Sequence, residues 1–273
     1  MTQAPEAPAQ PRDNRTRAQI SERTLRTDPW WKAPRITAAL LTIWVTYATV
    51  HVLTGHWYYV AKYHYLTPFY SPCISGECVT GSSTLGHWFP ALPPIIPYAL
   101  VSLPFVLGFR LSCYYYRRAY YRAFWRSPAA CAVREPHATY SGETKFPLIM
   151  QNLHRYFFYM VIVISALNTY DLTQAFRGPN GSFGFGLGTL IMGANVVLLW
   201  CYTLSCHSCR HITGGRLKNF SKHPVRYWAW TKISWLNARH MQLAWITLGT
   251  LMLTDLYILL VSSGAISDLR FFN

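Results

Sequence analysis

The hydrophobic positions of the chain gather in long stretches that polar segments separate. The stretches are Ile36–Leu53, Ile95–Cys113, Phe146–Tyr170, Phe185–Leu204 and Met241–Val261. Each is close to the length of about 20 mostly apolar residues that crosses a bilayer. Because a membrane-spanning segment must satisfy its own backbone hydrogen bonds, we expect each stretch to form a helix. The pattern therefore predicts an all-α membrane protein, a bundle of five transmembrane helices.

The chain divides into a short arm and this membrane domain. Residues 1–30 are rich in Pro, Ala, Gln and Arg and predict a disordered or extended basic N-terminal arm. Residues 31–273 form the predicted five-helix transmembrane domain. Polar residues precede the first apolar stretch and no small-residue cleavage site follows it, so it is not interpreted as a signal peptide.

Basic residues alternate between the connections. Residues 1–35, 110–145 and 205–240 each hold seven Lys or Arg, whereas residues 54–94, 171–184 and 262–273 each hold one. The positive-inside rule therefore places the N-terminus in the cytoplasm and the C-terminus outside. The formal net charge of +15 therefore mostly reflects the basic connections on the cytoplasmic side. With 51% hydrophobic residues in long runs, a nucleic-acid partner is not expected.

The cysteines divide between the two sides of the membrane. Cys73 and Cys78 lie in the first outer connection, where a disulfide forms if that compartment is oxidising and two free thiols remain if it is not. Cys206 and Cys209 form a Cys-x-x-Cys pair at the cytoplasmic end of the fourth stretch. In a reducing compartment such a pair indicates a metal site or a redox dithiol.

Topology brings further metal ligands to the same depth. His154 lies near the cytoplasmic end of the third stretch, and His240 begins the fifth. The sequence therefore predicts a metal site made by His154, Cys206, Cys209 and His240, with His207 and His211 as rival ligands from within the loop. Ionisable residues at membrane depth are costly and commonly serve a pathway or a cofactor. The alternative is that both histidines lie at the membrane interface without a ligand.

Three kinds of cofactor suit parts of this set. Two Cys and two His bind zinc tetrahedrally, and a Rieske-type [2Fe-2S] cluster takes the same four ligands. A haem b would instead use His154 and His240 as axial ligands and leave the cysteines unused. His51, near the outer end of the first stretch, is a weaker haem candidate.

The sequence resembles the membrane-anchor (cytochrome b-like) subunit of succinate dehydrogenase or fumarate reductase, in its actinobacterial single-subunit five-helix form. The resemblance covers roughly residues 30–265. Besides the five spans and the basic inner connections, it is carried by Asn152–Tyr156, Cys206–His211 and Arg239-His240. It implies a bacterial plasma-membrane protein that docks an iron–sulfur subunit, which in turn binds a flavoprotein. The succinate site is then on another chain, and electrons pass to a membrane quinone.

The resemblance also bears on the cofactor and on the quinone. Classical five-helix anchors hold two haems between His pairs, and this chain has too few helix histidines for that, which favours the cluster. A quinone beside the cluster would bind Arg155 or Arg239 through a ring carbonyl. Its ring would lie among aromatic side chains: Tyr156, Tyr159, Trp230 and Trp235. The same side chains also suit an interfacial belt, and Asp255 is either a proton-route group or paired with a neighbouring hydroxyl.

Two other classes of protein remain as alternatives. A membrane thiol oxidoreductase would use Cys206 and Cys209 as its redox pair, but such enzymes usually place the dithiol on the oxidising side. A scaffold or transporter would hold a structural zinc ion. Transporters usually show broken helices and polar sites near the midplane, whereas the polar residues of this sequence gather at one face.

Overall fold

The computed structural model describes residues 26–71, 73, 93, 96–133, 136, 145–146, 148–179 and 181–272. Most of the predicted N-terminal arm therefore lies outside the described residues. The α-helices are α1 (Lys32–Thr54), α2 (Leu103–Ser112), α3 (Tyr114–Tyr120), α4 (His154–Gln174), α5 (Leu187–Leu204), α6 (His207–Gly214), α7 (Pro224–Asn237) and α8 (His240–Ser262). Short strands pair as β1 (Tyr59–Val60) with β2 (Tyr65–Leu66), and β3 (Phe185–Gly186) with β4 (Arg270–Phe272).

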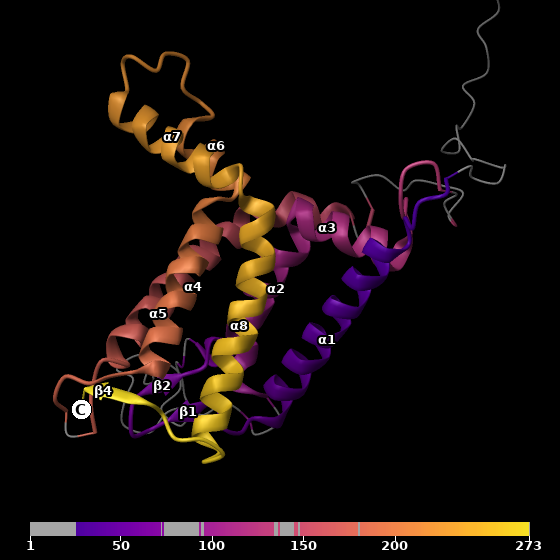
Figure 1. The fold of residues 1–273 in the computed structure, drawn as a ribbon. Coiled ribbons are helices and arrows are strands. Elements are labelled where there is room, and N and C mark those ends of the chain that lie inside the picture. Colours follow the sequence, from indigo (N-terminus) through magenta and orange to yellow (C-terminus); the bar gives the residue numbers. More distant parts are fainter. Residues whose placement is uncertain are drawn as a thin grey trace, which may run out of the picture.

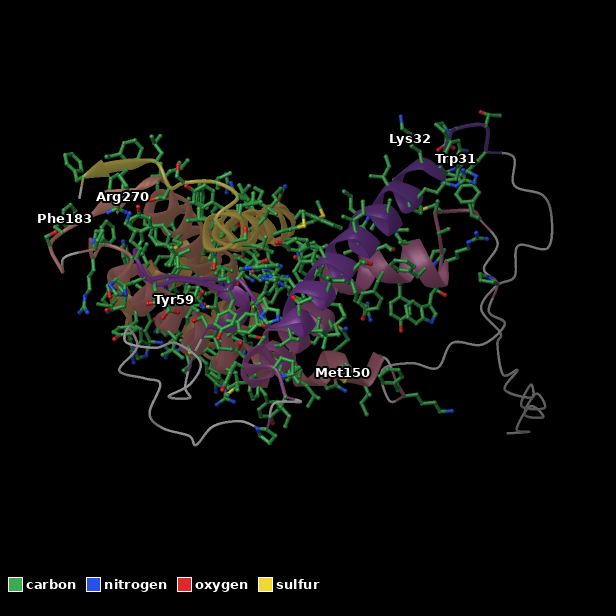
Figure 2. The ribbon with its side chains drawn as sticks, turned by 90° about the horizontal axis from the view of Figure 1, so that it is seen from below. Trp31, Lys32, Tyr59, Met150, Phe183 and Arg270 are labelled. Atoms are coloured by element: carbon green, nitrogen blue, oxygen red, sulfur yellow. The ribbon has the colours of Figure 1, made fainter. Side chains whose placement is uncertain are left out.

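Five of these helices run side by side. Figure 1 shows α1, α2, α4, α5 and α8 as neighbouring rods, with α3 and the α6–α7 hairpin at one end and the strands at the other. We call these the hairpin end and the strand end. The described chain enters at the hairpin end and the C-terminus lies at the strand end. Seen from below in Figure 2, Trp31 and Lys32 lie at the opposite edge of the molecule from Phe183 and Arg270.

Three helices are long and apolar enough to cross a membrane. These are α1, α5 and α8, with 23, 18 and 23 residues. They confirm the first, fourth and fifth predicted spans. The third predicted span becomes the turn η4 (Leu148–Leu153) followed by α4, which has 21 residues and buries polar side chains such as Asn168 and Asp171.

The second predicted span, Ile95–Cys113, is the one whose helix is much shorter than expected. The chain passes through the 3-10 turn η2 (Tyr98–Val101) before α2, which has only 10 residues and starts with a proline in its first turn. At 1.5 Å per residue, α2 covers roughly 15 Å, about half of the hydrocarbon core. The five-pass count and the orientation of the termini therefore stay predictions.

Two of the candidate histidines are the first residues of their helices. His154 begins α4 after η4, and His240 begins α8 directly after Arg239. Cys206 lies between α5 and α6, where its thiol accepts a hydrogen bond from the Ser208 amide at 3.3 Å. Because α4 and α8 start at the hairpin end and α5 finishes there, the fold brings these three side chains to one level.

A cluster of buried side chains lies at the strand end and includes Val52, Leu66, Phe69 and Tyr70. Cys73 belongs to this cluster and is disulfide-bonded. Its predicted partner, Cys78, lies outside the described residues. A bonded Cys73 fits the expectation that this end faces the oxidising side.

A buried carboxylate joins α1 to α8 near the strand end. Asp255 is fully buried in α8 and accepts hydrogen bonds from Tyr47 at 2.6 Å and Thr67 at 2.5 Å. His51 Nδ1 lies 2.6 Å from the same carboxylate. The predicted pairing of Asp255 with a hydroxyl is thus present, and it includes a histidine as well. These contacts stabilise the attachment of α1, whose own apolar surface is largely exposed in this chain.

We expect the substitution His51→Leu to lower the stability of the isolated membrane subunit. It leaves Asp255 buried without its nitrogen partner. Interhelical hydrogen bonds in membranes contribute about 1 to 2 kcal/mol, and removing one partner of a buried pair costs about 3 to 5 kcal/mol. We therefore expect the free energy of unfolding to fall by about 1 to 5 kcal/mol. The loss should appear as a lower unfolding temperature in detergent. His56→Leu, at an exposed position on the following loop, is the matched control, and equal unfolding temperatures for both variants would contradict the role of His51.

Candidate metal centre

Two imidazoles and two thiols meet at the hairpin end in a crossed arrangement. His154 Nε2 lies 3.1 Å from Cys206 Sγ, and His240 Nε2 lies 3.5 Å from Cys113 Sγ. We call these side chains the four-donor set. They come from the start of α4, the α5–α6 junction, the start of α8 and the α2–α3 junction. The set therefore depends on the packing of elements that are far apart in the sequence.

The two cysteines are each preceded by a serine that orients the opposite histidine. Ser112 Oγ lies 2.9 Å from His154 Nδ1, and Ser205 Oγ lies 2.6 Å from His240 Nδ1. Each imidazole thus has one nitrogen bound by a hydroxyl and the other directed at a thiol. In metal sites a partner on the second ring nitrogen fixes the orientation and basicity of a histidine ligand. Both histidines have that support before any metal binds.

Aromatic stacking holds both imidazole rings. Phe109 stacks on His154 with ring centroids 4.7 Å apart, and Tyr202 stacks on His240 at 5.0 Å, with interplanar angles of 6° and 3°. Phe109 and Tyr202 also contact each other edge to face at 5.5 Å. The stacked rings restrict rotation of the imidazoles, so the site is preorganised around its nitrogen donors.

The structure brings three of the four predicted side chains together, namely His154, Cys206 and His240. The second thiol beside the imidazoles is that of Cys113 and not that of Cys209. Cys209 is buried together with Cys113 and Cys206 in one apolar cluster, and it lies on the first turn of α6. Among the described residues, no hydrogen bond links Cys209 to either imidazole. Cys113, the last residue of the second predicted span, was not among the predicted ligands.

Among the described residues, the rival histidines of the loop make no hydrogen bond to the four-donor set. His207 is exposed on α6, with its ring centroid 6.2 Å from that of His240. His211 is exposed and accepts a hydrogen bond from Arg155 Nη2 at 2.7 Å. His51, the weaker haem candidate, lies beside Asp255 near the strand end, so the four-donor set does not include it.

Burial sets the chemistry of the thiols. It raises the pKa of Cys206 to about 11, with a smaller upward contribution from the neighbouring Cys113 thiol. Burial also raises the pKa of Cys209. A thiol that stays protonated is a weak nucleophile and a weak metal ligand, so this shift bears equally on a redox dithiol and on a metal site.

The six residues predicted to surround a quinone are spread over two surfaces. Tyr156 and Tyr159 are 67% and 47% exposed on α4. Trp235 on α7 is 59% exposed, with the Arg239 guanidinium 3.9 Å above its ring. Trp230 lies under the guanidinium of Arg210 at 4.8 Å. Arg155 is bound to His211, so the structure does not gather these side chains around one cavity.

A charged residue that the sequence analysis assigned to a basic connection lies inside the bundle. Arg110 is in the last turn of α2 and only 5% exposed. Its guanidinium donates to the Tyr116 hydroxyl and, at 3.3 Å, to Thr247 Oγ1 of α8. The sequence already indicated that Arg110 lies in the bundle, because it falls within the second apolar stretch.

Comparison with known proteins places most of the membrane domain in one family. Residues 32–264 match the family described as actinobacterial succinate dehydrogenase subunit SdhC. A chain in the solved structure titled Mycobacterium smegmatis Sdh1 complex in the apo form is 66% identical, with a TM-score of 0.87. The match covers 94% of this chain and 97% of that one. A search of curated proteins found no match.

Proposed function

The chain belongs to the family of actinobacterial succinate dehydrogenase subunits SdhC, and from this premise we propose that it holds a Rieske-type [2Fe-2S] cluster between the succinate-oxidising subunits and a membrane quinone. It is a multi-pass plasma-membrane subunit of a succinate dehydrogenase complex, whose active site for succinate is on another chain. The observation that carries the proposal is the four-donor set of Cys113, His154, Cys206 and His240.

The donor set fits a two-iron cluster better than a single ion. Within the described part of the chain, no three His, Cys, Asp or Glu side chains converge closely enough to hold one metal ion. A [2Fe-2S] cluster takes two ligands at each of two irons, and in the Rieske type two imidazoles bind one iron and two thiolates the other. Two nitrogens and two sulfurs supply that composition, although zinc takes the same four ligands. It is the separation of the donors, and not their composition, that favours the cluster over a structural zinc ion.

The cluster would bring one-electron chemistry at a potential suited to a quinone. Imidazole ligation places Rieske clusters at roughly −150 to +300 mV. The chain's own contribution is to orient the two imidazoles through Ser112 and Ser205 and to keep water away with the stacked rings. A haem b between His154 and His240 is less well supported, because both Nε2 atoms face thiols.

We further propose that the iron–sulfur subunit docks at the hairpin end and carries the flavoprotein on its other side. The segment 205–240, which contains α6 and α7, holds seven Lys or Arg and no Asp or Glu. Such a surface complements an acidic partner. It also lies next to the four-donor set, so a docked electron donor would be close to it.

Metal analysis of the purified complex tests the cofactor directly. We expect iron and labile sulfide beyond what the soluble subunits hold, measured as their loss when the membrane subunit is removed. We also expect a paramagnetic resonance signal shifted by imidazole ligation in the reduced complex. A split absorbance band of reduced haem, or zinc in place of the additional iron, would contradict the cluster.

A further inference from the structure

One hydroxyl beside the four-donor set is buried without a hydrogen-bond partner. Tyr202 lies in the last turn of α5 and is only 2% exposed. Its hydroxyl makes no hydrogen bond to any described residue, whereas the large majority of buried side-chain polar atoms in proteins are paired. Because an unpaired buried donor is costly, we expect this hydroxyl to have an acceptor in the assembled complex.

The ring of Tyr202 is held in place among the metal ligands. It stacks on His240 with ring centroids 5.0 Å apart and contacts Phe109 edge to face at 5.5 Å. The guanidinium of Arg110 lies 5.0 Å from the same ring. The hydroxyl lies beside the thiol of Cys113 but does not complete a hydrogen bond with it. These contacts leave the ring little freedom to turn its hydroxyl toward another acceptor.

The two thiols of the four-donor set differ in the donors that they meet. Cys206 precedes α6, and its Sγ accepts a hydrogen bond from the Ser208 amide at 3.3 Å. Cys113 precedes α3 in the same way, but its side chain makes no capping hydrogen bond to that helix. A thiol is a weak acceptor, whereas a thiolate is charged and accepts more strongly. The donor that Cys113 lacks is therefore available at Tyr202 once Cys113 is a thiolate ligand.

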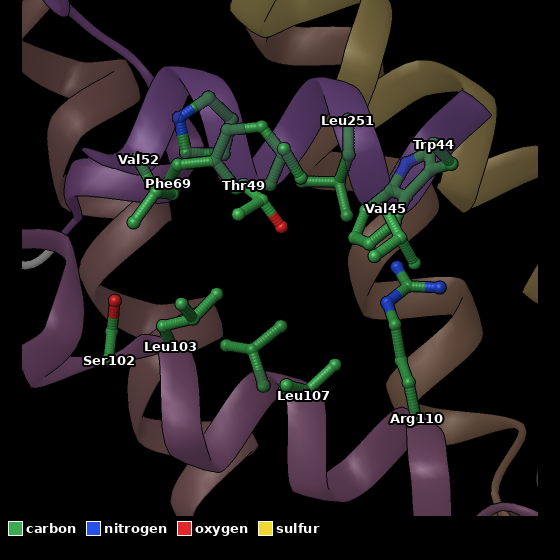
Figure 3. A pocket seen from close by; sticks show the side chains of 13 residues that line it. Trp44, Val45, Thr49, Val52, Phe69, Ser102, Leu103, Leu107, Arg110 and Leu251 are labelled. Atoms are coloured by element: carbon green, nitrogen blue, oxygen red, sulfur yellow. The ribbon is translucent and has the colours of Figure 1, made fainter. Parts of the chain in front are cut away.

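Arg110 adds a buried positive charge next to this hydroxyl. Of the described residues that line the pocket between α1 and α2, only Arg110 is charged, and Figure 3 shows its guanidinium directed toward Trp44 and Val45. Its hydrogen bonds go to hydroxyl and carbonyl oxygens and to no described carboxylate. A positive charge favours the more negative state of a neighbouring group. Arg110 and the Tyr202 hydroxyl therefore act on the Cys113 sulfur in the same direction.

We propose that Tyr202 donates a hydrogen bond to the Cys113 sulfur of the cluster and thereby raises the potential at which the cluster accepts an electron. The inference rests on the proposed function, which places a two-iron cluster at the four-donor set. Reduction adds one electron, which succinate oxidation on the other subunits supplies. No bond forms or breaks, and the hydroxyl keeps its proton. Because the reduced cluster is the more negative one, a donor to its sulfur ligand stabilises it more than the oxidised cluster.

Redox titration of the purified complex tests this role, with the imidazole-shifted resonance signal as the readout. Tyr202→Phe removes the hydroxyl and keeps the ring that stacks on His240. We expect the equilibrium constant for one-electron reduction of the cluster to fall about tenfold, which lowers the midpoint potential by about 59 mV. Tyr115→Phe is the matched control, because its ring contacts the same imidazole at 5.7 Å but the residue is only partly buried. Its midpoint potential should equal that of the wild-type complex.

A second measurement detects the proton of the hydrogen bond. Electron–nuclear double resonance of the reduced complex is compared in H2O and in D2O. The wild-type complex and Tyr115→Phe should show one exchangeable proton coupling that Tyr202→Phe lacks. A merely structural role of Tyr202 would not remove a single coupling while the rest of the signal stays.

The outcomes separate this role from the cluster itself. Equal midpoint potentials in Tyr202→Phe and Tyr115→Phe, with the iron retained, would overturn the role of Tyr202 and leave the cluster standing. Loss of the iron from Tyr202→Phe would also overturn it, because the hydroxyl would then be needed to build the site and not to set its potential. A wild-type complex without an imidazole-shifted signal would contradict the proposed function, and the role of Tyr202 would fall with it.

Discussion

Replacing both His154 and His240 by alanine is expected to abolish quinone reduction by the complex while succinate oxidation with an artificial electron acceptor continues. Each imidazole directs its Nε2 at a thiol of the four-donor set, so the double variant loses both of the nitrogen ligands that we propose. We expect the additional iron and its imidazole-shifted signal to disappear, and quinone reduction to fall by more than about 100-fold. Both rates can be measured on one purified preparation.

The matched control is the double variant His56→Ala and His64→Ala. Both histidines lie between α1 and β2 at the strand end, outside the four-donor set and outside the proposed docking segment 205–240. This variant should keep the iron and the quinone reductase rate. Unchanged quinone reduction in the His154 and His240 variant would remove both residues from the electron path. Loss of both activities together would indicate instead that the complex no longer assembles.

The second large effect is expected at Cys113. Cys113→Ser should remove the additional iron and the quinone reductase activity, because its thiol is the one beside His240. Cys209→Ser should retain both, since Cys209 is buried in the same cluster without a hydrogen bond to either imidazole. The two substitutions change the same atom at neighbouring buried positions, so each is the control for the other. Iron content per complex and the resonance signal are the measurements.

The reverse result would restore the ligand set expected from the Cys-x-x-Cys motif. If Cys209→Ser loses the iron and Cys113→Ser retains it, the metal is held by Cys206 and Cys209. Retention of the iron in both variants would contradict a site with two cysteine ligands.

Much of the four-donor set could be predicted from the sequence, because topology alone brings the ends of helices to one depth. His154, Cys206 and His240 were identified in this way. Cys113 was not predicted because the local Cys-x-x-Cys motif favoured Cys209, whereas the second thiol beside the imidazoles comes from another helix end. A signal was present: Leu-Ser-Cys occurs at residues 111–113 and again at 204–206. The serine of each copy orients one of the histidines.

The spans show where a hydropathy pattern reaches its limit. For α1, α5 and α8 the apolar residues and the helix coincide. For the second span, proline and the 3-10 turn η2 interrupt the helix, although the residues remain apolar. Arg110 was counted as a topology signal because charge alone does not distinguish a cytoplasmic loop from the last turn of a helix. Only packing against α8 shows that it is buried.

The four-donor set has a consequence for how the protein is made. Its members come from the ends of four separate helices, and the last of them, His240, begins α8. Chains emerge from the ribosome N-terminus first, so Cys113, His154 and Cys206 enter the membrane before their final partner exists. The four-donor set is therefore complete only once His240, the first residue of α8, has been made. A subunit truncated before that helix would lack one of its two imidazoles.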